Sequence, residues 1–182
     1  MDKIFSWVKR CPPQVSVLIR QEYVRYTYFP LCWENIVFIK RILAQFKKKS
    51  VYELAAGNGW VSYYLNRMGL KIDKVVDDFS WEKLTETEKP IKVHKQDAIK
   101  TIKDENPDVA FISWPPPEDD FLMNCFDVVK EKNYLVIIAD KNFKVSGNKI
   151  FFKENNKYLL MKKHLPYSFP GFQDVLYIYK KD

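Results

Sequence analysis

Residues 50–59 read Ser-Val-Tyr-Glu-Leu-Ala-Ala-Gly-Asn-Gly, a mostly apolar run that contains one acid and ends in two closely spaced glycines. The run predicts a short strand over residues 50–56, and the glycines predict a turn after it. Residues 60–68 then suit a helix that ends at Gly69. A strand, a glycine loop and a helix in this order predict a ligand site, because glycines let a ligand approach the backbone and the helix start offers free N–H groups.

Strand patterns alternate with helical patterns along the rest of the chain. An amphipathic helix is expected over residues 34–46 and another helix over 118–129. Residues 147–161 suit either a helix or a hairpin, and we expect a short helix there. Strands are expected over residues 71–76, 91–94, 107–113, 134–139 and 174–180. This order predicts an α/β fold: a doubly wound, mostly parallel, Rossmann-like sheet with an N-terminal helical extension.

The length of 182 residues predicts one domain, with a basic helical segment over 1–49 and an α/β core over 50–182. Residues 1–49 hold ten Lys and Arg against three Asp and Glu, whereas the rest of the chain holds twenty of each. From Arg20 to Tyr28, basic residues alternate with tyrosines, as in single-stranded nucleic-acid sites. The segment therefore has two interpretations: a surface for a nucleic acid, or an ordinary solvated helix face with tyrosines packed beneath it.

Cysteine and histidine are too scarce for a disulfide framework or a metal site. The three cysteines, Cys11, Cys32 and Cys125, include no CxxC pair, and the chain has only two histidines. No apolar run is long enough to cross a membrane, and no signal peptide is recognisable. We therefore expect a cytoplasmic protein without a metal and without a membrane partner.

Acidic residues close three successive predicted strands. They are Glu53, then Asp77 with its neighbour Asp78, and then Asp97. The carboxyl ends of parallel strands meet at one edge of a sheet, where ligands bind in open folds of this type. An acid there would repel a phosphate but suits a ligand with a positive charge or hydroxyl groups. A solvated loop acid is the alternative for any one of them.

With these residues the chain resembles the class I S-adenosylmethionine-dependent methyltransferases. Their first motif is an acid, a variable residue and then Gly-x-Gly-x-Gly, and Ala55 replaces the first glycine here. The resemblance implies S-adenosylmethionine as cofactor, with Asp77, in preference to Asp78, on the ribose hydroxyls and Asp97 near the adenine amino group. The cofactor contacts that it implies are Glu53, Ala55, Gly57, Asn58, Gly59, Asp77 or Asp78, Asp97 and Ala98.

A fourth motif, Ser113-Trp114-Pro115-Pro116, follows the fourth predicted strand. It resembles the Asn-Pro-Pro-Tyr, Asp-Pro-Pro-Tyr and Ser-Pro-Pro-Tyr motifs of amino-group methyltransferases, in which a side-chain oxygen and a carbonyl hold the target amine. Trp114 replaces the polar residue, and its indole only donates hydrogen bonds. The resemblance implies a catalytic role for these four residues, with the Ser113 hydroxyl and the Trp114 carbonyl orienting the acceptor. The alternative is a strand terminator with a packed tryptophan.

Together with residues 169–174, the Ser-Trp-Pro-Pro motif resembles a poorly characterised methyltransferase-like group. The expected activity is methyl transfer to a nitrogen or oxygen acceptor, either a nucleic acid or a small molecule. Tyr26, Tyr28 and Trp33 precede or begin the first long helix and are expected to cover the site and contact the substrate. The competing hypothesis is a catalytically inactive methyltransferase-like module that acts as a protein partner or RNA-binding subunit.

Overall fold

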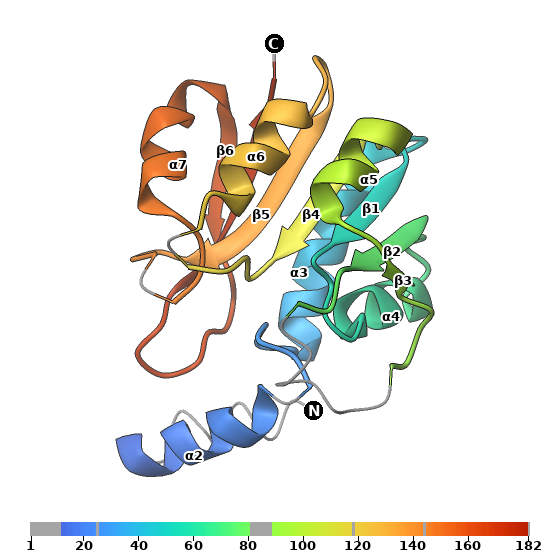
Figure 1. Ribbon diagram of the computed structural model, residues 1–182. Coiled ribbons are helices and arrows are strands. Elements are labelled where there is room, and N and C mark those ends of the chain that lie inside the picture. Colours follow the sequence, from blue (N-terminus) through green and yellow to red (C-terminus); the bar gives the residue numbers. More distant parts are fainter. Residues whose placement is uncertain (1–11, 25, 81–88, 118, 144, 182) are drawn as a thin grey trace.

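A seven-stranded sheet of order β3-β2-β1-β4-β5-β7-β6 runs through the molecule (Figure 1). The computed structural model describes residues 12–24, 26–80, 89–117, 119–143 and 145–181. Strands β1 to β5 are parallel, and β7 is antiparallel to both of its neighbours. The bounds are β1 Val51–Leu54, β2 Lys74–Asp77, β3 His94–Lys95, β4 Val109–Ser113, β5 Tyr134–Asp140, β6 Leu159–His164 and β7 Asp174–Lys180. The predicted doubly wound, mostly parallel sheet is confirmed.

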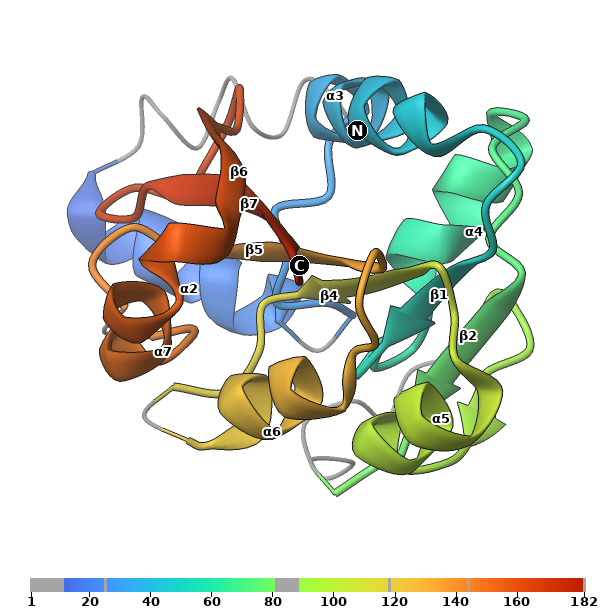
Figure 2. The same ribbon diagram turned by 90° about the horizontal axis from the view of Figure 1, so that it is seen from above.

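Helices cover both faces of this sheet (Figure 2). One face carries α3 (Trp33–Leu43), which continues into a 3-10 turn at Ala44–Phe46, and α4 (Trp60–Arg67). The other face carries α5 (Ala98–Glu105), α6 (Phe121–Val128) and α7 (Lys149–Glu154), the last followed by a 3-10 turn at Asn156–Tyr158. The central strands are therefore buried on both sides.

Burial on both faces explains the continuous apolar runs of the sequence. In β4, Val109 and Phe111 join the core beneath α3 and α4, while Ala110 and Ile112 join the core beneath α5 and α6. Strand β5 is buried at every position after Tyr134. Side chains alternate between the two faces of a strand, so a strand between two helical layers needs apolar residues throughout.

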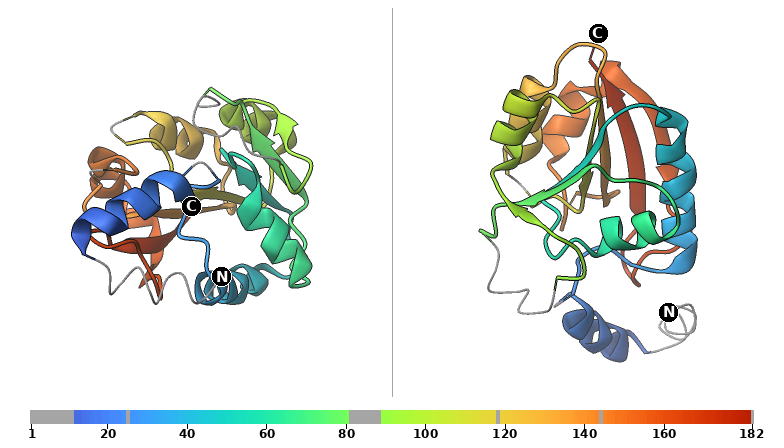
Figure 3. Two further views of the ribbon diagram at one scale, coloured as in Figure 1. Left: turned by 90° about the horizontal axis from the view of Figure 1, so that it is seen from below. Right: turned by 90° about the vertical axis from the view of Figure 1, so that its right-hand side faces the viewer.

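Helix α2 (Pro13–Tyr23) lies apart from these layers, across the carboxyl ends of the central strands (Figures 1 and 3). It begins with Pro13, whose fixed φ and missing N–H suit the first turn of a helix. The loop after α2 returns along the same edge before α3 begins. The N-terminal extension thus faces the edge at which parallel α/β sheets bind ligands.

The element boundaries differ from the sequence predictions in three places. The third strand is only His94–Lys95, because Ile91 and Val93 instead pack against the glycine loop after β1. Helix α5 and edge strand β6 were not predicted, whereas the short helix expected within 147–161 is α7.

Among the described residues, no helix combines the length and apolarity that crossing a membrane would require.

Candidate active site

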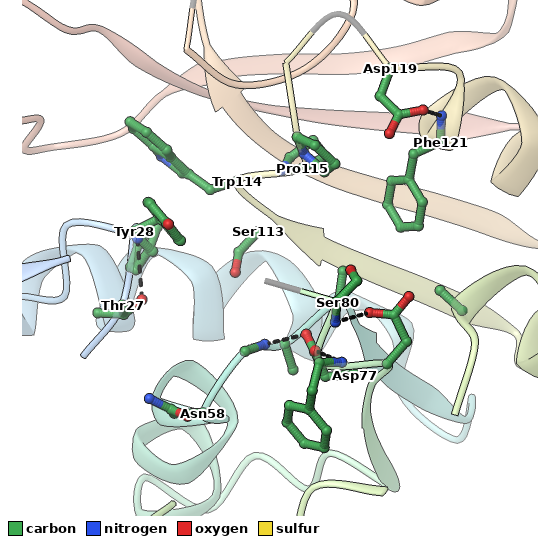
Figure 4. Close-up of a pocket in the computed structure, with 18 of the residues that line it drawn as sticks. Thr27, Tyr28, Asn58, Asp77, Ser80, Ser113, Trp114, Pro115, Asp119 and Phe121 are labelled. Carbon is green, nitrogen blue, oxygen red and sulfur yellow. Dashed lines mark hydrogen bonds between the residues drawn. The ribbon is translucent and has the colours of Figure 1, made fainter. Parts of the chain in front are cut away.

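A cavity of about 470 Å³ opens at the carboxyl ends of β1, β2 and β4 (Figure 4). Its size is typical of small-molecule sites, and its position is the expected ligand edge of the sheet. The lining residues come from the loops after α2, β1, β2, β3, β4 and β5: Tyr26, Thr27, Tyr28, Phe29, Ala55, Ala56, Gly57, Asn58, Asp77, Asp78, Phe79, Ser80, Asp97, Ala98, Ser113, Trp114, Pro115, Pro116, Pro117, Asp119, Phe121 and Val145.

The two glycines of the first loop serve different purposes. Both have left-handed backbone, with φ of 56° at Gly57 and 77° at Gly59. A Cβ on Gly57 would meet no atom within 4 Å, and Gly57 lines the cavity beside Ala55 and Asn58. A Cβ on Gly59 would lie 2.7 Å from Ile91 Cγ2 and 2.9 Å from Val93 Cγ2. Gly59, predicted to contact the cofactor, is instead outside the cavity lining and permits close packing of the loop on residues 91–93.

Asp77 ties the end of β2 to the glycine loop. Its Oδ2 accepts a hydrogen bond of 2.7 Å from Gly57 N–H, and its Oδ1 accepts one of 2.6 Å from Phe79 N–H. Burial raises the pKa of this carboxyl, although the two backbone donors act in the opposite direction. Asp78 is exposed and accepts 2.8 Å from Ser80 N–H. Both acids line the cavity and keep lone pairs for further donors.

Asp97 caps the first turn of α5. Its Oδ1 accepts a hydrogen bond of 2.6 Å from Lys100 N–H. Such a cap satisfies one of the free N–H groups at a helix start. Asp97 is exposed, the adjacent Ala98 is buried, and both line the cavity, so the structure brings these two predicted residues to the same edge as Asp77.

The cavity wall is acidic. Four aspartates line it, and the described lining residues include no lysine, arginine or histidine. Carboxylates gathered in a cleft concentrate a field of one sign, which attracts cations and disfavours phosphates. The charge of the site therefore suits a cationic ligand.

Glu53 lies behind this wall rather than in it. Its side chain is fully buried, and Oε2 accepts from the Ser62 backbone N–H at 3.1 Å and also from the Ser62 hydroxyl. Burial raises the pKa of Glu53 to about 7; the Asp77 carboxylate acts in the same direction, whereas hydrogen bonds with Ser62 and Ser113 act against the shift. Glu53 is not among the lining residues, so its predicted cofactor contact is not a direct one in this structure.

Trp114 lines the cavity, but the partners of its indole, Asp174 and Arg20, are not lining residues. Its indole Nε1 donates a hydrogen bond of 2.7 Å to Asp174 Oδ1 on β7, and the Arg20 guanidinium of α2 lies 5.5 Å from its ring centroid. Its side chain points away from Ser113 (Figure 4). Trp114 also has a left-handed backbone, with φ of 57°, although it is not a glycine. These contacts immobilise the residue that replaces the polar member of the fourth motif.

The carbonyl of Pro115 is also occupied. It accepts hydrogen bonds from the Ser146 hydroxyl at 3.0 Å and from Gly147 N–H at 3.1 Å, which uses both of its lone pairs. The Trp114 carbonyl, in contrast, accepts no hydrogen bond within the described part of the chain. All four predicted motif residues line the cavity, but the Ser113 hydroxyl and the Trp114 carbonyl are the acceptors left open there.

The tyrosines after α2 form another part of the lining. Tyr26 is half exposed, whereas the Tyr28 hydroxyl is buried and has no hydrogen-bond partner in the part of the chain that the structure describes. Burial raises the pKa of Tyr28. Trp33, predicted to cover the site, is 55% exposed at the start of α3 and lies outside the lining, because α3 turns away from the cavity mouth.

Sequence reasoning missed several lining residues, among them Phe79, Asp119, Phe121 and Val145. Phe79 directly follows the acids of β2, so its position in the chain was a usable signal. Val145 belongs to a loop after β5 that reaches the site only through the fold, and no local pattern indicates it.

Solved structures of known proteins share this fold. No family model matches the sequence, and no curated protein matches it. Among solved structures, the N-methyltransferase NodS from Bradyrhizobium japonicum WM9, in complex with S-adenosyl-l-homocysteine, superposes with a TM-score of 0.57 at 12% identity, over 81% of this chain and 86% of NodS. The chain has the fold of a methyltransferase.

Two further methyltransferases show the same likeness. The methyltransferase domain of bacterial CtHen1 gives a TM-score of 0.54 at 12% identity, over 81% of this chain and 97% of that domain. Magnesium protoporphyrin IX methyltransferase from Synechocystis PCC 6803, with bound S-adenosylmethionine, gives 0.54 at 9% identity, over 81% of this chain and 78% of the enzyme. At these identities the likeness is one of fold, so the methyltransferase fold predicted from the sequence is confirmed.

Proposed function

We propose that the protein is an S-adenosylmethionine-dependent methyltransferase that acts on a nitrogen or oxygen acceptor. The acidic cavity at the carboxyl ends of β1, β2 and β4 carries the proposal, because the glycine loop lines it and no basic side chain does so among the described residues. A dinucleotide or triphosphate would lack cationic partners there. The sulfonium and ammonium groups of S-adenosylmethionine would find carboxylates.

The residues present fit this cofactor. Gly57 leaves open space where a Cβ would stand, so the methionine portion can approach the loop formed by Ala55, Gly57 and Asn58. Asp77 or Asp78 would accept hydrogen bonds from the ribose hydroxyls, and Asp97 with Ala98 would contact the adenine. The S-adenosyl-l-homocysteine bound to NodS and the S-adenosylmethionine bound to the protoporphyrin enzyme support the choice by analogy of fold. When bound, the cofactor supplies a methyl group on positively charged sulfur.

The acceptor would lie on the side of the cavity lined by Ser113, Tyr28 and Trp114. The amino-group arrangement of related motifs needs a side-chain oxygen and a carbonyl. Trp114 has no such oxygen, and the Pro115 carbonyl is already saturated. We therefore propose that the Ser113 hydroxyl and the Trp114 carbonyl orient the acceptor, whether it is a small molecule or a nucleotide. Holding the two reactants in line can supply most of the acceleration.

Calorimetric titration with S-adenosylmethionine and S-adenosylhomocysteine tests the cofactor. The expected result is binding that weakens at least tenfold in Asp77→Ala, because that change removes the ribose acceptor and its bond to Gly57 N–H. Glu131→Ala, an exposed carboxylate outside the cavity, is the matched control and is expected to bind as the wild type does. Absence of binding at millimolar cofactor would remove the proposal.

Activity is tested by transfer of a labelled methyl group to fractions of RNA, DNA, protein and small molecules. The proposal expects label in one fraction and none after Ser113→Ala or without enzyme. Cofactor binding without transfer to any fraction would instead favour the inactive binding module.

A further inference from the structure

Glu53 has a buried carboxylate oxygen without a partner. The side chain is fully buried, both hydrogen bonds from Ser62 go to Oε2, and Oε1 accepts none from the described residues. A buried acceptor that lacks a donor costs free energy, so such an atom often marks a site whose partner arrives with a ligand or a proton. Glu53 therefore has a free position for a proton directly behind the cavity wall.

Ser113 stands between this oxygen and the cavity. Strands β1 and β4 are parallel with Glu53 opposite Phe111, so Ser113, two residues further along β4, projects from the same face of the sheet as Glu53. The Ser113 hydroxyl lowers the pKa of Glu53, so it lies near the carboxyl, while Oε1 has no hydrogen-bond partner within the described residues. It also lines the cavity, where it points into the space between Tyr28 and Asp77 (Figure 4). The hydroxyl can thus face a bound molecule on one side and Glu53 on the other.

We propose that Ser113 and Glu53 together accept the proton that the methyl acceptor loses. The inference rests on the proposed function. When an uncharged N–H or O–H acceptor takes the methyl group, the bond between the methyl carbon and sulfur breaks and its electron pair stays on sulfur. The acceptor proton then passes to Ser113 Oγ while the Ser113 hydroxyl proton passes to Glu53 Oε1. Charge and atoms balance without a further reactant.

The surroundings of Glu53 suit this role better than those of the other acids. The groups that face it are Ser62 of α4, Ser113 of β4 and the Asp77 carboxylate of β2, which opposes its ionisation. A pKa near neutrality lets a base be both largely ionised and able to take a proton at physiological pH. Each Asp77 oxygen, in contrast, already accepts a backbone N–H. The implied substrate class is an uncharged acceptor with hydrogen on its nucleophilic atom.

Carbon-detected NMR titration of the full chain, labelled at glutamate carboxyl groups, tests the coupling without any cofactor or acceptor. The Glu53 signal is assigned by its loss in Glu53→Gln and is expected to titrate near pH 7. Ser113→Ala removes a group that favours the charged form, so the midpoint is expected to rise. An unmoved midpoint in Ser113→Ala, or an ordinary glutamate pKa in the wild type, would overturn the proposal.

The second test is the pH profile of methyl transfer to the fraction that accepts label. Wild-type turnover is expected to rise through about pH 7 as Glu53 ionises. Glu53→Gln is expected to bind S-adenosylmethionine within about tenfold of wild type yet transfer methyl groups roughly 100-fold more slowly at pH 8, with a flat profile. Exposed Glu131→Gln is the control that keeps the wild-type profile.

The outcomes of this test separate the two proposals. If Glu53→Gln transfers methyl groups at the wild-type rate and with the wild-type pH profile, proton transfer through Ser113 to Glu53 is overturned. The methyltransferase proposal would still stand in that case. Wild-type protein that binds no cofactor would remove both. If Glu53→Gln fails to fold, Glu53→Asp assigns the Glu53 signal, and the NMR midpoint of Glu53 in Ser113→Ala carries the test, because that measurement needs no turnover.

Discussion

The buried carboxyl of Glu53 makes the stability of the protein depend on pH. Its pKa is raised to about 7 in the folded chain, whereas the unfolded side chain titrates near 4.5. A raised folded pKa gives stability that is fully present below pH 4.5 and is lost as the pH rises through 7. From a shift of this size we expect the wild type to lose about 3 kcal/mol between those limits.

Urea unfolding of wild type and Glu53→Gln at several pH values measures this loss. The neutral amide has no such titration, so the stability of the variant relative to wild type is expected to rise by about 3 kcal/mol from pH 4.5 to pH 8. Asp174, whose pKa burial raises to about 6, titrates in both proteins and cancels in the comparison. A difference between the two proteins that does not change with pH would contradict the buried position of Glu53.

Gly57 and Gly59 are expected to respond differently to the same substitution. Gly59→Ala forces a Cβ against Ile91 and Val93 at positive φ, so we expect a loss of about 2–3 kcal/mol in stability. Gly57→Ala meets open space and should cost only about 1 kcal/mol of backbone strain. Because Gly57 lines the cavity, its variant should instead weaken S-adenosylmethionine binding, as calorimetry would show. Equal stability losses at both positions would contradict this division.

For single residues, a position next to a predicted strand end could be read from the sequence. A role that depends on contacts with residues distant in the chain could not. Asp77 ends β2, Asp78 directly follows it, and Asp97 lies two residues after β3. A strand end is a local property, so the common position of these acids could be predicted. Gly59 was predicted to contact the cofactor because it belongs to the glycine motif. Only the tertiary structure shows that residues 91–93 pack where a Cβ of residue 59 would stand. The saturated Pro115 carbonyl depends on Ser146, thirty-one residues away.

Among the elements, α2 contacts the rest of the fold through one basic side chain, Arg20, which packs on aromatic rings. Arg20 lies 4.7 Å from the ring centroid of Phe172 and 5.5 Å from that of Trp114, and burial lowers its pKa. Partly desolvated cation–π contacts of this kind contribute about 1–2 kcal/mol each. Arg20→Ala is therefore expected to loosen α2 from the cavity edge while the sheet stays intact.

Hydrogen exchange resolved by peptide checks this expectation. Residues 13–23 should exchange at least several-fold faster in Arg20→Ala, whereas β4 and β5 keep their protection. Gln21→Ala, one position along the helix on an exposed side chain, is the matched control and should leave α2 as it is. Unchanged exchange over α2 in the arginine variant would show that other contacts, such as the bond from the Tyr23 hydroxyl to the Leu31 carbonyl, suffice.

Elements with a strong pattern were predictable, and those at the edges of the sheet were not. Strands β4 and β5 are buried on both faces, which leaves an unmistakable apolar run. Strand β6 is an edge strand with three exposed residues at its end, Lys162, Lys163 and His164, so its sequence carries little hydrophobic signal. Helix α5 has only eight residues, too few for a clear periodicity.

For the whole molecule, the distribution of charge bears on the acceptor. Lys47, Lys48 and Lys49 precede β1 and therefore lie at the amino edge of the sheet, opposite the cavity. Lys49 pairs with Asp108, and Arg20 is stacked on aromatic rings of the protein. None of these four basic residues is among the lining residues of the acidic cavity. If a nucleic acid is the acceptor, the basic residues outside the described ranges are among those available to hold it, and Lys3, Lys9 and Arg10 are three of them in the N-terminal segment.

Binding of single-stranded RNA at several salt concentrations tests this consequence. Contacts to about three phosphates predict that log K falls with log salt at a slope near −2, since single strands give about −0.7 per phosphate. Changing Lys3, Lys9 and Arg10 to Gln together should weaken the affinity at least tenfold and bring the salt slope close to zero. The charge-matched control changes Arg41, Lys47 and Lys48, all exposed near the amino edge of the sheet, and should keep both. Equal losses in the two triple variants would show that net charge alone attracts RNA, and absent binding in the wild type would leave small molecules as the acceptor class.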